Sequence, residues 1–153
     1  MAFALNAESE KELLFGFKER TFQKIYRATV KGVPKIKQAV LSAYLLKDSD
    51  SSIVKIYDNH VKGSAPIKTG YKLIKTDGET SVLEVELYTG KTHQIRAHLA
   101  YIGYPIVGDG KYGDFAFNKK HGVSSQMLTA TSITFHFEKE SVLSYLDGKT
   151  FNI

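Results

Sequence analysis

The chain has 153 residues, of which 42% are hydrophobic and 24% charged, so it can form one globular domain, and a largely disordered protein is excluded. It contains no cysteine, which excludes disulfides and thiolate metal sites and fits a reducing, cytoplasmic location. The net charge of +5 favours a polyanionic partner such as nucleic acid, although many soluble domains are mildly basic without one. No secretory leader or membrane-spanning segment is predicted, and no membrane partner is expected.

The first part of the chain predicts one helix followed by strands. The helix is expected from residue 6 to about residue 20, with Asn6 as its N-cap, acidic residues in its first turn and an apolar stripe. Polar segments at residues 47–52 and 59–66 and a hairpin turn at residues 76–79 separate the strands. Strands are predicted at residues 21–30, 39–46, 53–57, 67–74 and 82–88.

The second part predicts another helix and one more strand. The helix is expected at residues 92–102, with Thr92 as a candidate N-cap and Gly103 as its stop. A glycine-rich loop at residues 105–115 and a strand at residues 127–137 follow, before a tail with a weak pattern. Together the elements predict an α+β fold, a mostly antiparallel mixed sheet with few helices in a single domain over residues 1–153.

The helix predicted at residues 92–102 has two different faces. At about 100° per residue, one face carries an apolar stripe. His93 and Arg96 lie on the other side as an i,i+3 pair. Together with Lys91 they gather positive groups near a helix N-terminus, where free N–H groups favour anions. This segment therefore predicts a phosphate or carboxylate site. The stripe consists of Ile95, Leu99 and Ile102.

Two of these residues also have plainer interpretations. His98 lies at the margin of the apolar stripe, where a hydrogen-bonded histidine packed beside the core is the more common case. His93 and His98 lie on different faces, so they do not form a metal-binding pair. Arg96, taken alone, could equally belong to a structural ion pair.

Two strings in this region carry a family resemblance. Residues 90–99 read Gly-Lys-Thr-His-Gln-Ile-Arg-Ala-His-Leu, and residues 103–113 read Gly-Tyr-Pro-Ile-Val-Gly-Asp-Gly-Lys-Tyr-Gly. Both resemble, in order and spacing, the G-[RK]-T-H-Q-I-R-x-H-L and G-x-P-I-x-G-D-x-x-Y-G motifs of RluA-type RNA pseudouridine synthases. Residues 24–32 resemble the K-x-Y-x-A-x-V-x-G strand of that family. Residues 126–135 resemble its late L-H-A strand, with Thr129 where histidine is commoner.

The resemblance implies an RNA-modifying isomerase. Such enzymes convert uridine to pseudouridine in rRNA or tRNA with a single aspartate and without a metal or cofactor. In this family the aspartate lies in an H-R-L-D motif upstream of the K-x-Y strand, and no such motif occurs here. The chain is therefore expected to be the C-terminal part of the catalytic domain, without the half that holds the nucleophile, and to be inactive alone. Asp109 belongs to the downstream Gly-Asp loop and is not taken as a substitute.

The resemblance also implies roles for individual residues. Tyr26 would hold the flipped base by stacking, and Arg96 would keep the aspartate ionised and oriented. Lys24 shares a strand face with Tyr26 and is an RNA-binding candidate. Tyr26 and Leu128 could instead be ordinary core residues, and the lysines could be solvated surface charges. The remaining candidates are Lys91, His93 and Lys111 for flanking phosphates and Leu128 for a wall of the uracil pocket.

Two other functions remain open at this point. The chain could be a natural RNA-binding module that has the scaffold but not the nucleophile, or a general basic, β-rich nucleic-acid binder. If part of a continuous sheet is missing, an unpaired strand edge would be exposed, and dimerisation through that edge is expected.

Overall fold

The computed structural model describes residues 3–48 and 52–153, so the predicted polar loop at residues 47–52 lies partly outside the described residues. The predicted α+β class is confirmed. The elements are α1 (Ala7–Glu19), β1 (Gln23–Lys31), β2 (Gln38–Lys47), β3 (Val54–Tyr57), β4 (Ala65–Thr76), β5 (Thr80–Leu87), α2 (Gln94–Tyr101), α3 (Phe115–Lys120), β6 (Leu128–Thr134), the 3-10 helix η1 (Ser144–Leu146) and β7 (Thr150–Asn152).

The strands form one sheet in the order β3-β2-β4-β5-β1-β6-β7. Within residues 3–48 and 52–153 every strand pairing is antiparallel, so no parallel part of the expected mixed sheet occurs there. The predicted hairpin between β4 and β5 is confirmed. Its turn is closed by the Asp77 carboxylate, which accepts the backbone N–H groups of Glu79 and Thr80, and Gly78 supplies the positive φ of 94°.

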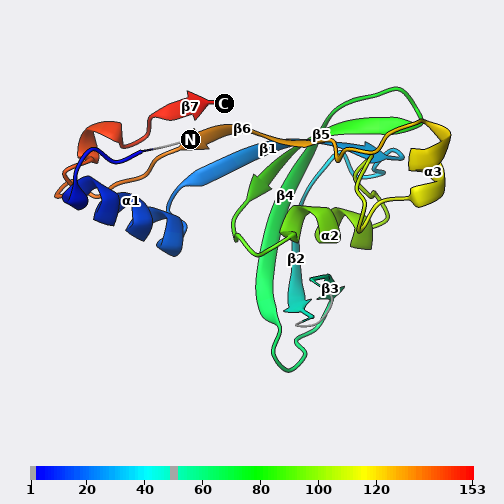
Figure 1. Ribbon diagram of the computed structural model, residues 1–153, viewed down its shortest axis with the longest axis horizontal. Coiled ribbons are helices and arrows are strands. Elements are labelled where there is room, and N and C mark those ends of the chain that lie inside the picture. Colours follow the sequence, from blue (N-terminus) through cyan, green and yellow to red (C-terminus); the bar gives the residue numbers. More distant parts are fainter. Residues whose placement is uncertain (1–2, 49–51) are drawn as a thin grey trace.

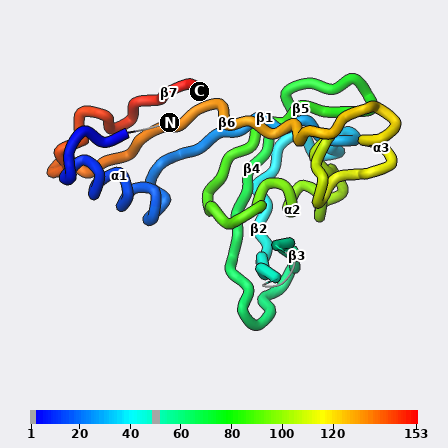
Figure 2. The backbone as a smooth tube through the Cα atoms, in the orientation of Figure 1, coloured from blue at the N-terminus to red at the C-terminus, as the bar shows by residue number. Residues whose placement is uncertain are grey.

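The two longer helices, α1 and α2, lie apart from each other in the molecule (Figure 1). α1, η1 and β7 lie together at one end of the molecule, and α2 and α3 lie towards the other. α1 and α2 are on the same side of the sheet. β2, β3 and the first half of β4 project from the sheet as an arm, which the backbone trace shows most clearly (Figure 2).

The core lies between the sheet and α2. Alternate residues of β1 and β5 face α2 and are fully buried, among them Val30 and Leu83. From α2, Ile95 and Leu99 belong to the same buried cluster and Ile102, partly buried, packs against it, so the predicted apolar stripe is confirmed. Burial of side chains of this size stabilises the fold by about 1.5–3 kcal/mol each. α2 is thereby fixed on the sheet, and its polar face is held in a defined place.

α1 is held mainly by aromatic packing. Its predicted cap is confirmed, because the Asn6 side chain accepts the N–H of Ser9 at 2.8 Å. The apolar stripe is mostly exposed, with Leu14 at 62%, and Gly16 is the buried residue of this helix. A Cβ at Gly16 would lie 2.1 Å from the Phe22 ring, so only glycine allows this close approach.

The predicted elements differ from the structure in three places. Thr92 is not the N-cap of α2, because the helix begins at Gln94 after His93, whose φ is 56°. The side chain of Gln94 accepts the N–H of Lys91 in the preceding turn at 3.0 Å, and the His93 side chain makes no capping hydrogen bond. The segment after the glycine-rich loop forms α3, which Asp114 caps and which was not predicted. The last predicted strand ends at residue 134, and the tail adds β7.

Candidate functional site

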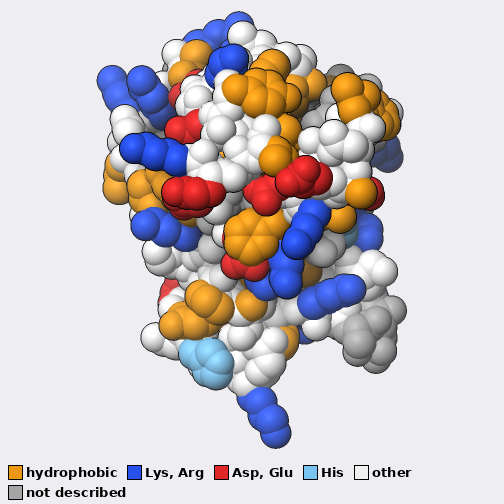
Figure 3. All heavy atoms as spheres, turned by 90° about the vertical axis from the view of Figure 1, so that its left-hand side faces the viewer, with side chains coloured by type: hydrophobic (Ala, Val, Ile, Leu, Met, Phe, Trp, Pro, Cys, Tyr) orange, Lys and Arg blue, Asp and Glu red, His pale blue; other side chains and the backbone are white. Residues whose placement is uncertain are grey.

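A pocket of about 400 Å³ opens between the C-terminal end of α1, the first residues of β1 and the loop between β5 and α2. Its walls combine aromatic and basic side chains. Among the described residues that line it there is no Asp or Glu. Seen from the α1 end, Lys and Arg, Asp and Glu, and hydrophobic side chains all lie on this side of the molecule (Figure 3). The residues of interest are Phe17, Arg20, Lys24, Tyr26, Tyr88 and Lys91.

Tyr26 lies where the core meets this pocket. It is held in the middle of the sheet, opposite Val85 on β5 and Ala130 on β6. It packs against the core cluster and also lines the pocket, so part of its surface is core packing and part faces the pocket, and the base-holding role stays a prediction. Burial raises the pKa of the Tyr26 phenol, which therefore stays protonated at neutral pH.

Lys24 shares the pocket with Tyr26, as the strand periodicity predicts. Its ammonium lies over the ring of Phe17, 4.7 Å from the centroid, which fixes the side chain by a cation–π contact. Burial, and to a smaller extent the charge of Arg20, lowers the pKa of Lys24. Lys91 lines the same pocket from the loop before α2. The pocket therefore concentrates positive charge beside an aromatic ring.

Arg96 lies on the polar face of α2 and pairs with Asp109. Its Nε and Nη2 donate to the two carboxylate oxygens at 2.7 and 2.8 Å. The Asp109 side chain is fully buried and also accepts the backbone N–H groups of Lys111 and Tyr112. Burial alone raises the pKa of Asp109, but these hydrogen bonds outweigh it and hold the pKa at about 2. Arg96 is thus oriented by a bidentate ion pair.

Lys91, His93 and Arg96, which were expected to form a single anion site, do not all lie together. Lys91 lines the pocket, whereas Arg96 is neutralised by Asp109, so the three positive groups divide between two places. The sequence places Arg96 and Asp109 in adjacent motifs but gives no sign that they are partners, because the loop brings Asp109 back to the helix only in three dimensions.

Tyr112 organises the second group of residues. The guanidinium of Arg96 lies over its ring at 5.3 Å, and its hydroxyl is 3.1 Å from Nδ1 of His93. Burial, followed by the charges of Arg96 and Lys111, lowers the pKa of His93. Lys111 is exposed and donates to the backbone carbonyl of Ser52 at 3.3 Å. His93, Arg96 and Lys111 are therefore close together but away from the pocket lining, and sequence reasoning missed Tyr112 and Asp109 as their organisers.

His98 and Leu128 belong to the core side of the site. His98 is 2% exposed, its Nδ1 is 3.0 Å from the Thr69 hydroxyl, and burial lowers its pKa to about 4. The prediction of a hydrogen-bonded, packed histidine is confirmed. Leu128 begins β6 opposite Ala28, is partly buried and packs against the same core cluster as Tyr26 without lining the pocket.

Neither a metal cluster nor a membrane helix is found in the described ranges. No three His, Asp or Glu side chains in residues 3–48 and 52–153 are grouped so that they could hold a metal ion. In the same ranges, no helix is long and apolar enough to cross a bilayer.

The sequence has clear relatives among curated proteins. "Ribosomal large subunit pseudouridine synthase C" of Vibrio vulnificus is 38% identical over 122 residues, which is 78% of this chain and 38% of the relative. "Uncharacterized RNA pseudouridine synthase" of Chloroflexus aurantiacus is 37% identical over 113 residues, which is 74% of this chain and 34% of the relative. The chain thus spans little more than a third of the length of these relatives.

The fold and the family comparison agree with these relatives. The solved structure of "Human RNA Pseudouridylate Synthase Domain Containing 1" superposes with a TM-score of 0.76 at 25% identity and covers 91% of this chain and 60% of that one. Residues 1–101 match the family described as RNA pseudouridylate synthase, which confirms the resemblance carried by the motifs. The chain therefore belongs to the RNA pseudouridylate synthase family.

Proposed function

We propose that this chain supplies the base-holding and RNA-binding part of an active site that isomerises uridine to pseudouridine in rRNA or tRNA. The observation that supports this most strongly is the pocket in which Tyr26, Lys24 and Lys91 meet without any acidic neighbour in its lining. An aromatic ring suits a flipped base, and free cations suit the phosphates beside it. The names of the curated relatives favour ribosomal RNA as the substrate.

In the proposed complex the target uridine leaves its stack and enters the pocket. Unstacking costs a few kcal/mol, and stacking on Tyr26 returns about 1–3 kcal/mol. Lys24 and Lys91 contact flanking phosphates, and Leu128 packs against the same core cluster as Tyr26. Lys111 extends the positive surface next to α2, and His93, whose pKa is lowered by burial and by the charges of Arg96 and Lys111, offers a phosphate a hydrogen bond from its neutral ring.

Arg96 is proposed to orient the nucleophilic carboxylate. The two bonds to Asp109 use Nε and Nη2, so the donors of Nη1 are not used by this pair. The ion pair fixes the guanidinium plane, and Tyr112 covers one face of it. An arginine held in this way can present its remaining edge to a second carboxylate in a fixed direction.

The chain alone is proposed to be inactive, because no aspartate in it follows His-Arg-Leu. The test uses RNA labelled with tritium at carbon 5 of uridine. Formation of the new bond at carbon 5 releases that hydrogen to water, so tritium release measures isomerisation. We expect no release with the 153-residue chain. Release at a catalytic rate would refute the assigned roles.

A non-catalytic RNA-binding module is the second candidate function. The missing His-Arg-Leu-Asp motif is the observation that favours it. The native coding sequence decides between the two: an H-R-L-D codon run in frame upstream of Met1 supports the enzyme, and a start codon at Met1 with no upstream coding sequence supports the module.

Self-association and a cytoplasmic location complete the proposal. β7 forms one edge of the sheet, and all three of its residues are exposed, so its backbone is open to pairing with a second chain. Sedimentation at high protein concentration tests this, and a strictly monomeric species would contradict it. Fractionation of cells that express the protein tests the location, since RNA substrates of this kind are cytoplasmic in bacteria.

A further inference from the structure

We propose that Arg20, at the C-terminal end of α1, binds RNA: together with Lys24 it forms a subsite for the backbone phosphate next to the uridine held by Tyr26. This deepens the proposed function and rests on it, because it adds α1 to the nucleotide-binding surface. Neither the family motifs nor the helix pattern assigned any role to Arg20.

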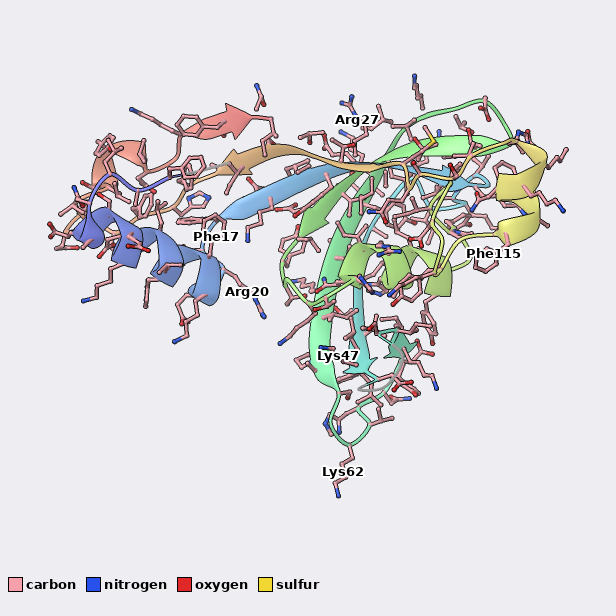
Figure 4. All side chains as sticks on the ribbon, viewed as in Figure 1. Phe17, Arg20, Arg27, Lys47, Lys62 and Phe115 are labelled. Atoms are coloured by element: carbon pink, nitrogen blue, oxygen red, sulfur yellow. The ribbon has the colours of Figure 1, made fainter. Side chains whose placement is uncertain are left out.

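The position of Arg20 is the first support. It directly follows the last residue of α1 and lines the same pocket as Lys24 and Tyr26. Its side chain extends from the end of the helix towards the loop between β5 and α2, and Phe17 lies one helical turn earlier (Figure 4). Phe17 packs edge-on against Phe22, with ring centroids 5.1 Å apart, and carries the ammonium of Lys24 over its face. α1 therefore supplies one cation and positions a second.

The charge balance is the second support. None of the ion pairs found in the described residues involves Arg20, Lys24 or Lys91. Burial and the charge of Arg20 lower the pKa of Lys24, so the two cations repel each other where solvent is partly excluded. A phosphodiester between them would relieve that repulsion, and the planar guanidinium is suited to bind it with two hydrogen bonds.

The surroundings of the two cations identify the class of ligand. Tyr26 and Tyr88 line the same pocket as Arg20, Lys24 and Lys91. A free phosphate would use the cations but not the rings, whereas a nucleotide within an RNA strand uses both. We therefore assign the subsite to a backbone phosphate of single-stranded RNA.

The backbone of Arg20 makes a clean test possible. Its φ of 61° lies in the left-handed region, where helices most often place glycine, and its N–H donates to the carbonyl of Gly16. Glycine would form the same turn with less strain, so the turn does not need an arginine side chain. The plainer alternative is that Arg20 only complements the negative end of the α1 dipole. In that case Arg20→Gly would destabilise the fold and leave RNA binding by the folded chain unchanged.

The experiment measures binding of a fluorescein-labelled oligouridylate to the 153-residue chain across a salt series, by fluorescence anisotropy. We expect Arg20→Gly to weaken binding by about 3–10-fold and to reduce the salt slope by about 0.7, the value of one single-strand phosphate contact. Arg20→Lys should keep most of the affinity. Excess inorganic phosphate should compete poorly, because it lacks the base.

Arg27→Gln is the matched control. Arg27 is the exposed neighbour of Tyr26 in β1, and its side chain points to the opposite side of the sheet (Figure 4). The Arg27→Gln variant loses one positive charge, as Arg20→Gly does, so it measures the effect of net charge alone. Loss of affinity in Arg20→Gly that clearly exceeds the loss in Arg27→Gln, at an unchanged or higher unfolding midpoint, supports the subsite. Equal losses in the two variants would overturn it, as would a lower midpoint of Arg20→Gly with unchanged binding by the folded chain.

Tyr26→Leu separates this inference from the proposed function. If Tyr26→Leu weakens binding and Arg20→Gly does not, the phosphate subsite is wrong and the base pocket stands. If the unmodified chain does not bind oligouridylate at all, both are wrong.

Discussion

Two groups of cations lie on either side of the start of α2, and they differ in how their charges are balanced. Arg96 has a buried carboxylate as its partner, and Tyr112 covers its guanidinium. Lys24 and Lys91 line a pocket without an acidic residue, where Lys24 rests on an aromatic ring. The charge of Arg96 is balanced without a ligand, whereas the charges of Lys24 and Lys91 are not balanced by an acidic residue in the pocket lining.

This difference predicts which of the two groups contacts RNA directly. Charges that are already paired keep their position when RNA is absent, so they suit the orientation of a reacting group. Cations without acidic neighbours gain most when a phosphate arrives. We therefore expect changes in the Arg96 group to appear first in stability, and changes in the pocket to appear first in RNA affinity.

Asp109→Ala should have the largest effect. It leaves Arg96 without its partner and removes the acceptor of two backbone N–H groups, so the free energy of unfolding should fall by about 3–5 kcal/mol. Urea unfolding measures this. Glu79→Ala is the control, because Glu79 is 55% exposed and its ion pairs with Lys120 and His121 should contribute less than about 1 kcal/mol. Similar losses in both variants would show that Asp109 is not a structural centre.

Acid should weaken the fold through His98. Its pKa is about 4 in the folded chain, below its ordinary unfolded value of about 6.5. Between these values the unfolded state binds a proton that the folded state does not, so the stabilisation is complete above about pH 6.5 and is lost as the pH falls to about 4. The expected loss is about 3 kcal/mol.

Urea midpoints at several pH values measure the effect of His98. His98→Gln should flatten the dependence in this window, whereas His136→Gln should not, because His136 is half exposed. An unchanged slope in His98→Gln would assign the acid sensitivity to another group.

Tyr26→Leu should reduce RNA affinity by about 1–3 kcal/mol through the loss of stacking, while much of the core packing is kept. Tyr26→Phe retains the ring and should bind nearly as well as the unmodified protein. The measurement is oligouridylate anisotropy. If Tyr26→Phe and Tyr26→Leu bind equally well, Tyr26 is only a core residue.

Lys91→Gln should have the smallest effect. It removes one phosphate contact, so the salt slope should fall by about 0.7 with little change in stability. Lys119→Gln, on the exposed surface of α3, is the control and should leave the slope unchanged. Equal slopes in the two variants would show that Lys91 is an ordinary surface charge.

Local patterns predicted much of the fold. The strand alternation of β5, the cap at Asn6 and the hairpin around Asp77 depend on residues close in sequence, and all three are confirmed. The start of α2 was misplaced because residues 91–94 form a turn in which His93 has a φ of 56°. The side chain of Gln94, which sequence patterns treat as an ordinary helical residue, accepts the N–H of Lys91 in this turn. β7 was missed because three exposed residues carry no alternation of buried and exposed positions.

The site was predicted less completely than the fold. The strand periodicity placed Lys24 and Tyr26 together, and they share the pocket. Arg96 pairs with Asp109 because the loop after α2 folds back onto that helix. Arg20 lines the pocket because α1 packs beside the start of β1. Such contacts have no local pattern, so only the three-dimensional arrangement reveals them.

Photo-crosslinking of an RNA oligonucleotide that contains 4-thiouridine, followed by mass spectrometry of the linked peptides, tests the central claim most directly. If the uridine binds beside Tyr26, crosslinks should fall in residues 17–26 and 87–92, and Tyr26→Leu should reduce them. Crosslinks confined to α3 or to the arm formed by β2, β3 and β4 would contradict the account.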